Sequence, residues 1–98
     1  MKAPSRPTRK AAETLAIQAL GFLAAEPERL RRFLNVTGIE AAQIRAAAAE
    51  PGFLAGVLDH IRGDERLLLD LAADTGIDPA AVAPARRALG EKGDREGP

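Results

Sequence analysis

Hydrophobic positions along this chain recur with the spacing of α-helices, and glycine or proline separates one helical segment from the next. In the middle of the chain, apolar side chains fall three or four residues apart, at Phe53, Leu54, Val57, Leu58 and Ile61. Alanine and leucine fill most apolar positions and lose little side-chain freedom in a helix, whereas β-branched residues are scarce. The pattern predicts an all-α protein.

Capping residues and helix breakers divide the chain into six predicted short helices. Proline is favoured in the first turn of a helix, and glycine is favoured just past its end. The helices are expected at about Arg9–Ala25, from Pro27 to Gly38, at about Glu40–Ala49, from Pro51 to Gly63, from Asp64 to Gly76, and from Pro79 onward. Pro84 is expected to break or kink the last helix, because proline lacks an N–H and clashes with the preceding turn.

Two segments of the chain carry similar short motifs in the same order. The first holds Gly21-Phe22-Leu23, Glu28-Arg29-Leu30 and Thr37-Gly38-Ile39, and the second holds Gly56-Val57-Leu58, Glu65-Arg66-Leu67 and Thr75-Gly76-Ile77. One three-helix unit is too small to bury its own apolar face. We therefore predict two related helix-turn-helix-like units, residues 10–49 and 51–90, packed on each other into a single compact domain. Chance similarity among helices rich in alanine and leucine is the alternative.

Each Thr-Gly-Ile corner resembles the turn of a DNA-binding helix-turn-helix. A small residue before the glycine and an aliphatic residue after it let two helices cross closely, as Ala72 and Val82 would around Gly76. Base readout also needs hydrogen-bond donors on the first turn of the second helix, where this chain has mainly acids, prolines and alanines. Only Arg45 could contact a base there. We expect both corners to serve packing.

Charge is unevenly distributed along a chain whose formal net charge is zero. Residues 11–90 hold eight basic and eleven acidic side chains, so this part lacks the basic surface of most nucleic-acid-binding proteins. Residues 1–9 are expected to be a disordered basic arm, residues 10–90 a helical domain and residues 91–98 a disordered polar tail. We favour a solvated arm, because no aromatic residue accompanies its cations to stack on bases. The cations in or beside the arm are Lys2, Arg6, Arg9 and Lys10.

Candidate catalytic and metal-binding residues are few. The chain has no cysteine, which excludes disulfides, thiolate catalysis and zinc sites with cysteine ligands. His60 is the single histidine, with Asp59 beside it and Asp64 four residues later, and a solvated or capping histidine is the simpler interpretation. No phosphate-binding glycine loop or nucleophile elbow occurs. We expect a protein that is not an enzyme and binds neither a cofactor nor a metal ion.

Two hydrophobic residues lie off the apolar stripes of their predicted helices. Leu67, Leu68 and Leu71 form the inward stripe of the fifth helix, and Leu69 lies outside it. Ile17 is similarly placed in the first helix. If exposed, either residue would contribute to an apolar contact surface. We favour burial, because both helices are expected to be central.

Several motifs between residues 14 and 90 occur in a recognisable combination. They are FLA at Phe22–Ala24, TGI at Thr37–Ile39, PGFLAGVLD at Pro51–Asp59 and GIDPAAVAPARRALG at Gly76–Gly90. In this combination the chain resembles a family of small alphaproteobacterial proteins known as a domain of unknown function. The resemblance implies a small cytoplasmic helical protein and supplies no activity, cofactor or functional residue. Pro84 and His60 depart from the family pattern.

These observations predict a protein that acts by binding. No apolar run approaches the ~20 residues of a membrane span, so no membrane association is expected. The leading hypothesis is a non-enzymatic protein–protein interaction or adaptor module. It would bind another protein, or a second copy of itself, through an apolar groove that includes Ile17 and Leu69. The alternative is a nucleic-acid-binding regulator that uses the basic arm and Arg45.

Overall fold

Residues 7–90 are the part of the chain that the computed structural model describes, and they form six α-helices and one short 3₁₀ turn. The elements are α1 (Arg9–Ala24), α2 (Pro27–Thr37), η1 (Ala41–Gln43), α3 (Ile44–Ala47), α4 (Pro51–Arg62), α5 (Glu65–Thr75) and α6 (Pro79–Ala88). None of these residues lies in a strand, and the predicted all-α class is confirmed. Residues 1–6 of the predicted arm and the whole predicted tail lie outside the described residues.

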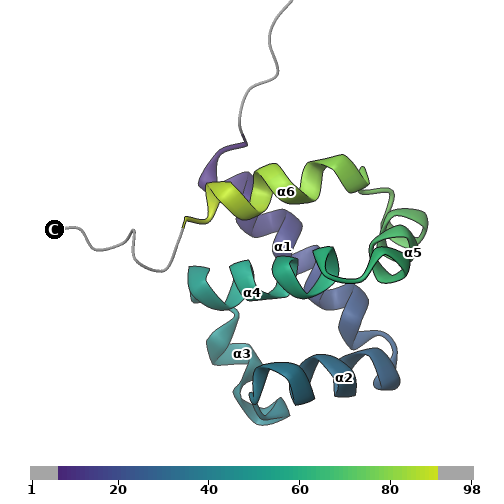
Figure 1. Ribbon diagram of the computed structural model, residues 1–98. Coiled ribbons are helices and arrows are strands. Elements are labelled where there is room, and N and C mark those ends of the chain that lie inside the picture. The colour runs from purple at the N-terminus through teal and green to yellow at the C-terminus, as the bar shows by residue number, and fades with distance from the viewer. Residues whose placement is uncertain (1–6, 91–98) are drawn as a thin grey trace, which may run out of the picture.

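α1 is the central helix of the fold. It packs against α2, α4, α5 and α6, and the end of α6 lies beside the beginning of α1 (Figure 1). Fully buried side chains come from all five of these helices, whereas α3 contributes none. The largest of them are Phe33, Leu23, Leu54, Leu58, Ile61, Leu71, Val57 and Val82. A single hydrophobic core therefore joins both halves of the described chain. None of the described helices has the length and apolar composition needed to cross a membrane.

The predicted helix starts are confirmed by their capping hydrogen bonds. The Thr8 hydroxyl accepts a hydrogen bond from the amide of Ala11 at 3.0 Å at the start of α1. Asp64 accepts in the same way at the start of α5, and Asp78 does so at the start of α6. Such caps satisfy amides that have no partner inside the helix. Helices α2, α4 and α6 each begin with the proline that the sequence placed there.

The two Thr-Gly-Ile corners have the same geometry. Gly38 (φ 78°, ψ 6°) and Gly76 (φ 81°, ψ 1°) both adopt the left-handed conformation that ends a helix. The hydroxyls of Thr37 and Thr75 each donate to the carbonyl four residues earlier, at 3.0 and 2.7 Å. Each hydroxyl also accepts from the amide two residues later, at 3.3 and 3.1 Å. The repeated sequence therefore specifies a repeated local structure.

The likeness between the two halves does not extend to complete three-helix units. α6 has ten residues and packs against both α1 and α4, whereas α3 has four residues and makes few contacts with other helices. The second half is thus a compact trio, but the third helix of the first half does not fold back onto α1. The predicted pairing of two equivalent units is not confirmed.

The third helix is shorter than the predicted span Glu40–Ala49. The chain first forms the 3₁₀ turn η1, which a capping box between Glu40 and Gln43 holds in place. One α-helical turn follows, and the chain is extended again at Glu50 (φ −99°, ψ 125°). Residues before proline avoid the helical conformation, so Pro51 keeps Glu50 out of any helix. Between Ala47 and Glu50 the chain tightens into turns in which the amides of Ala49 and Glu50 donate to carbonyls three residues earlier.

Pro84 does not break α6, which runs without interruption from Pro79 to Ala88. Proline at this position leaves the carbonyl of Ala80 without its usual helical donor. Ala80 is exposed, so water can bind that carbonyl. On either side of the proline, Val82 and Ala85 are buried, and this packing against α1 and α4 holds the helix together.

Candidate functional site

One side of α1 remains exposed along most of its length. Ile17 lies there and is 50% exposed, so the predicted burial of this residue is wrong. α1 is central, but its four neighbours pack around the opposite side, and none of the described helices covers this one. α1 carries no charged residue after Glu13. We call the exposed side the neutral face; its residues are Thr14, Ile17, Gln18, Gly21 and Ala24.

Leu69 is also exposed, at 53%, so its predicted burial is wrong as well. α5 buries only Leu71 fully, and its outer side faces solvent. Exposed charged residues flank Leu69 on that side, including Arg66 and Asp70. Val36, at the end of α2, is 69% exposed and was missed, although it too lies off the apolar stripe of its helix. The three exposed hydrophobic residues lie on three different helices.

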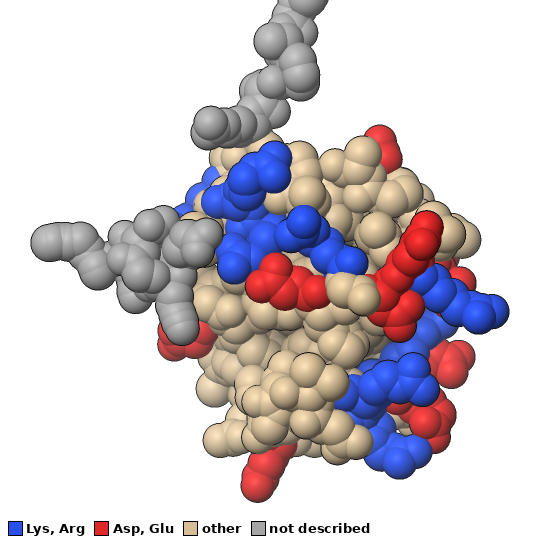
Figure 2. Space-filling model, viewed as in Figure 1, with Lys and Arg blue, Asp and Glu red and all other residues tan. Residues whose placement is uncertain are grey.

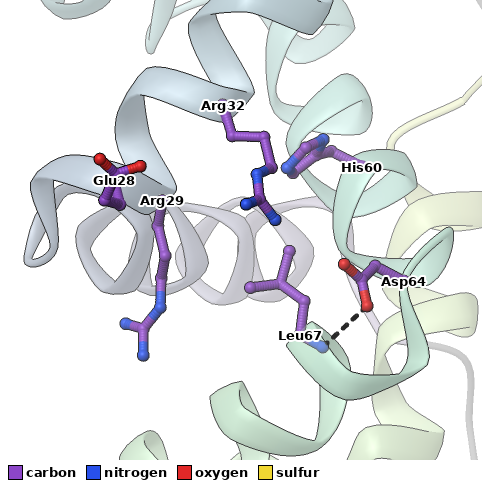
Figure 3. A pocket seen from close by; sticks show the side chains of 6 residues that line it. All are labelled: Glu28, Arg29, Arg32, His60, Asp64 and Leu67. Carbon is purple, nitrogen blue, oxygen red and sulfur yellow. Dashed lines mark hydrogen bonds between the residues drawn. The ribbon is translucent and has the colours of Figure 1, made fainter.

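A second candidate site is a pocket of about 90 Å³ where α2, the end of α4 and the start of α5 meet (Figure 3). The residues that line it are Glu28, Arg29, Arg32, His60, Asp64 and Leu67. None of them belongs to α1, so this pocket and the neutral face are separate surfaces. The sequence indicated His60 and Asp64 as neighbours, but it gave no sign that two arginines of α2 join them.

Arg29 is held in place by the end of α1. Its guanidinium lies over the ring of Phe22, 4.0 Å from the ring centre, and donates a hydrogen bond to the Phe22 carbonyl at 3.3 Å. Such a cation–π contact stabilises the arginine in one position. Arg32 points between His60 and Leu67 (Figure 3). It forms no ion pair or side-chain hydrogen bond with residues 7–90.

His60 is half-buried at the wall of the pocket, not solvated as the sequence suggested. Its ring meets the ring of Phe33 edge to face, with the centres 5.1 Å apart. Burial lowers the pKa of His60 below its ordinary value of 6.5; Asp64 acts in the opposite direction, and Arg32 lowers it further. The lowered pKa favours the neutral form of the imidazole.

Asp59 does not join His60 and Asp64. Its carboxylate accepts a hydrogen bond from the Arg86 side chain at 2.8 Å and lies 3.9 Å from Arg62, so it links α4 to α6. Asp64 is engaged as the cap of α5. The candidate acid–base residues are thus divided: His60 and Asp64 line the pocket, whereas Asp59 lies between α4 and α6. No group of three or more potential metal ligands occurs in residues 7–90.

The cations of the nucleic-acid hypothesis do not form one surface. Lys2 and Arg6 lie outside the described residues, and Arg9 and Lys10 are exposed at the start of α1. Arg45 is exposed on α3, at the opposite end of the view from the start of α1 (Figure 1). α3 is only four residues long, which is too short for a helix that reads bases along a groove. Figure 2 shows a group of Lys and Arg side chains around α6.

Comparison with known proteins identifies one family. The model of the family described as "Protein of unknown function (DUF3572)" matches residues 9–92. This match confirms the resemblance to a family of unknown function, and it does not bear on the expected alphaproteobacterial origin. No curated protein and no solved structure matches the chain.

Proposed function

The chain belongs to the DUF3572 family of unknown function, and we propose that it is a non-enzymatic protein–protein interaction module that docks through the neutral face of α1. The observation that carries this proposal is the exposure of Ile17 in the middle of a helix face without charge. Charged residues make up 29% of the chain, so a charge-free face on its central helix is unusual. A bacterial, cytoplasmic setting is part of the proposal and rests on the family resemblance.

The composition of the neutral face suits a partner helix. Ile17 supplies an aliphatic anchor, and Gly21 and Ala24, one and two turns further on, would let a second helix approach closely. Glycine inside a helix costs about 1 kcal/mol relative to alanine. Nothing inside this fold requires it at Gly21, where a methyl group would have no neighbour within 4 Å. Contact with another protein would explain a glycine at this position.

The partner that fits this face is an amphipathic helix with aliphatic side chains. A 16-residue helix such as α1 is about 24 Å long. An amphipathic helix of three to four turns would cover the neutral face and bury Ile17, as in other helix-mediated recognition. A second copy of this chain could supply such a helix. The mass of the complex distinguishes a dimer of this chain from a complex with a different protein.

The proposal is tested by the size of the native protein in extracts of cells that produce it. We expect the full chain to elute with a partner, well above its own 10.3 kDa. Ile17→Glu should release it as a monomer, because a buried, unpaired carboxylate is strongly unfavourable. Leu69→Glu is the matched control and should leave the complex intact. A wild-type monomer, or equal loss of the complex in both variants, would contradict the proposal.

Nucleic-acid binding is the second candidate, favoured by the cationic side chains around α6 in Figure 2. Arg9 and Lys10 start α1 beside the end of α6, where Arg86 and Arg87 lie in the last turn. Arg86 is engaged by Asp59 and by the Gly90 carbonyl, which reduces the cations free to contact phosphate. This hypothesis predicts duplex binding that weakens steeply with salt and is lost when residues 1–10 are removed. The absence of a mobility shift at low salt would exclude it.

A further inference from the structure

The charged side chains around the pocket between α2, α4 and α5 are not equally compensated. Glu28 pairs with Arg31 at 2.6 Å, and its carboxylate points away from the pocket in Figure 3. The Asp64 carboxylate accepts a hydrogen bond from the amide of Leu67 at 3.2 Å. Glu28 is thus neutralised by Arg31, whereas Arg29, Arg32 and Asp64 form no ion pair in the described part of the chain. Two cations and one anion remain, so the net charge around the pocket is positive.

The arginines also have free hydrogen-bonding capacity. A guanidinium carries five N–H donors, and Arg29 uses one of them on the Phe22 carbonyl. Its stacking on Phe22 fixes the side chain before any ligand arrives, so less side-chain entropy is lost on binding. Arg32 extends toward His60 and Leu67, which places its donors beside an imidazole and an apolar wall (Figure 3). Donors that face such a half-enclosed space suit an oxygen-rich anion.

We propose that this pocket binds one compact oxyanion, a carboxylate or a phosphate-type group, through the guanidinium of Arg32 beside His60, while Arg29, held on Phe22, lines the opposite side of the pocket (Figure 3). The pocket is small, about 90 Å³, and has room for one such group. The planar fork of arginine matches both anions in bidentate geometry. This site is independent of the docking proposed for the neutral face, because α1 contributes no lining residue.

His60 provides a direct report of binding, because it is the only histidine in the chain. Its imidazole C–H signals in an NMR spectrum of the full-length protein are therefore unambiguous. The protein would be titrated with pH in sulfate, a non-titrating stand-in for phosphate esters, or in acetate, with chloride at matched ionic strength as reference. An oxyanion beside the imidazole favours its protonated form, so we expect the pKa of His60 to rise by about half a unit, saturating with anion concentration.

Two exposed arginines, one in the pocket and one outside it, give a matched pair of variants. Arg32→Gln should abolish the anion-dependent change at His60, and it should also raise the starting pKa, because Arg32 lowers it. Arg66→Gln removes the same charge, but Arg66 does not line the pocket and forms no ion pair in the described part of the chain, so the anion response should persist. Both side chains are exposed, and circular dichroism would confirm that both variants fold.

The outcomes separate the two anion classes. A response to sulfate alone supports a phosphate-type ligand, and a response to acetate, with or without sulfate, supports a carboxylate. If neither anion changes the titration of His60 relative to chloride, the inference is overturned. It is also overturned if Arg32→Gln and Arg66→Gln respond equally, because the effect would then be general screening. The Ile17→Glu variant should show the same anion response at His60 as the wild type, because Ile17 does not line the pocket. A negative result for anion binding would therefore leave the docking proposal intact.

Discussion

Two glycines set the direction of the chain after α2 and after α5. Gly38 and Gly76 have φ values of 78° and 81°, where a residue with a Cβ is strained. Around them, threonine hydroxyls make the same pair of hydrogen bonds at both corners. These contacts are local, within six residues of sequence, which is why the corners could be predicted from the sequence.

Replacement of Gly76 by alanine should lower the free energy of unfolding by about 1–2 kcal/mol, because a left-handed alanine is strained. Gly21→Ala is the contrasting change: Gly21 has helical backbone and open space around it, so we expect a gain of about 0.5–1 kcal/mol. Urea unfolding of the two variants and the wild type measures both. A Gly76→Ala variant that is more stable than the wild type would mean that the corner is not left-handed.

His60 should make stability depend on pH. Its folded-state pKa is lowered, so the unfolded chain binds the proton more readily than the folded protein does. The contribution of His60 to the free energy of unfolding is complete above its unfolded pKa of 6.5. It is lost as the pH falls through its lower folded-state pKa. The free energy of unfolding should therefore decline more between about pH 7.5 and about pH 5.5 in the wild type than in His60→Gln. Parallel declines would show that His60 does not titrate differently on folding.

The exposure of single residues is the part of the candidate site that could not be predicted from the sequence. Ile17 and Leu69 were identified as off the apolar stripes, and that is correct. Whether another helix covers an off-stripe residue depends on where all the neighbours pack, which a helical repeat does not encode. The position of Arg29 on Phe22 is similar, because it depends on how the chain turns between α1 and α2.

At the scale of elements, helix starts follow from the sequence more closely than helix ends and interruptions. Thr8, Asp64 and Asp78 cap helices through side-chain oxygens within a few residues, and Pro27 and Pro51 begin helices. Pro84 shows the limit of such local reasoning. Tertiary packing on both sides of it outweighs the cost of one missing hydrogen bond.

Pro84→Ala should therefore stabilise the protein by about 1–3 kcal/mol, because it restores a donor to the Ala80 carbonyl and relieves the clash in α6. The loss of proline rigidity in the unfolded chain offsets part of this gain. Thermal and urea unfolding both measure the change. A variant less stable than the wild type would indicate that α6 depends on the geometry imposed by Pro84.

Phe33 is the one fully buried residue of α2 and its main attachment to the core. It meets the ring of Phe53 with centres 5.8 Å apart, and it meets His60 on α4. Phe33→Ala should cost about 3–5 kcal/mol, most of the stability of a domain this small. Val36→Ala, on the same helix, should change stability by less than about 0.5 kcal/mol. Similar losses for both would contradict the placement of α2.

At the scale of the whole molecule, one core supports two separate candidate surfaces. α1 contributes to the core on one side and presents the neutral face on the other, whereas the pocket is formed by α2, α4 and α5. The fold class could be predicted from helical periodicity. The pocket could not, because it assembles residues from positions 28 to 67 that only the tertiary structure brings together.

The most direct test of the docking face is photo-crosslinking of the full chain in the cells that produce it. A photoreactive amino acid would replace Gln18, which is exposed on the neutral face, or Asp70, which is exposed on α5. We expect a single discrete adduct from position 18, lost on Ile17→Glu, and none from position 70. Adducts of equal yield from both positions, or from position 70 alone, would contradict docking through α1.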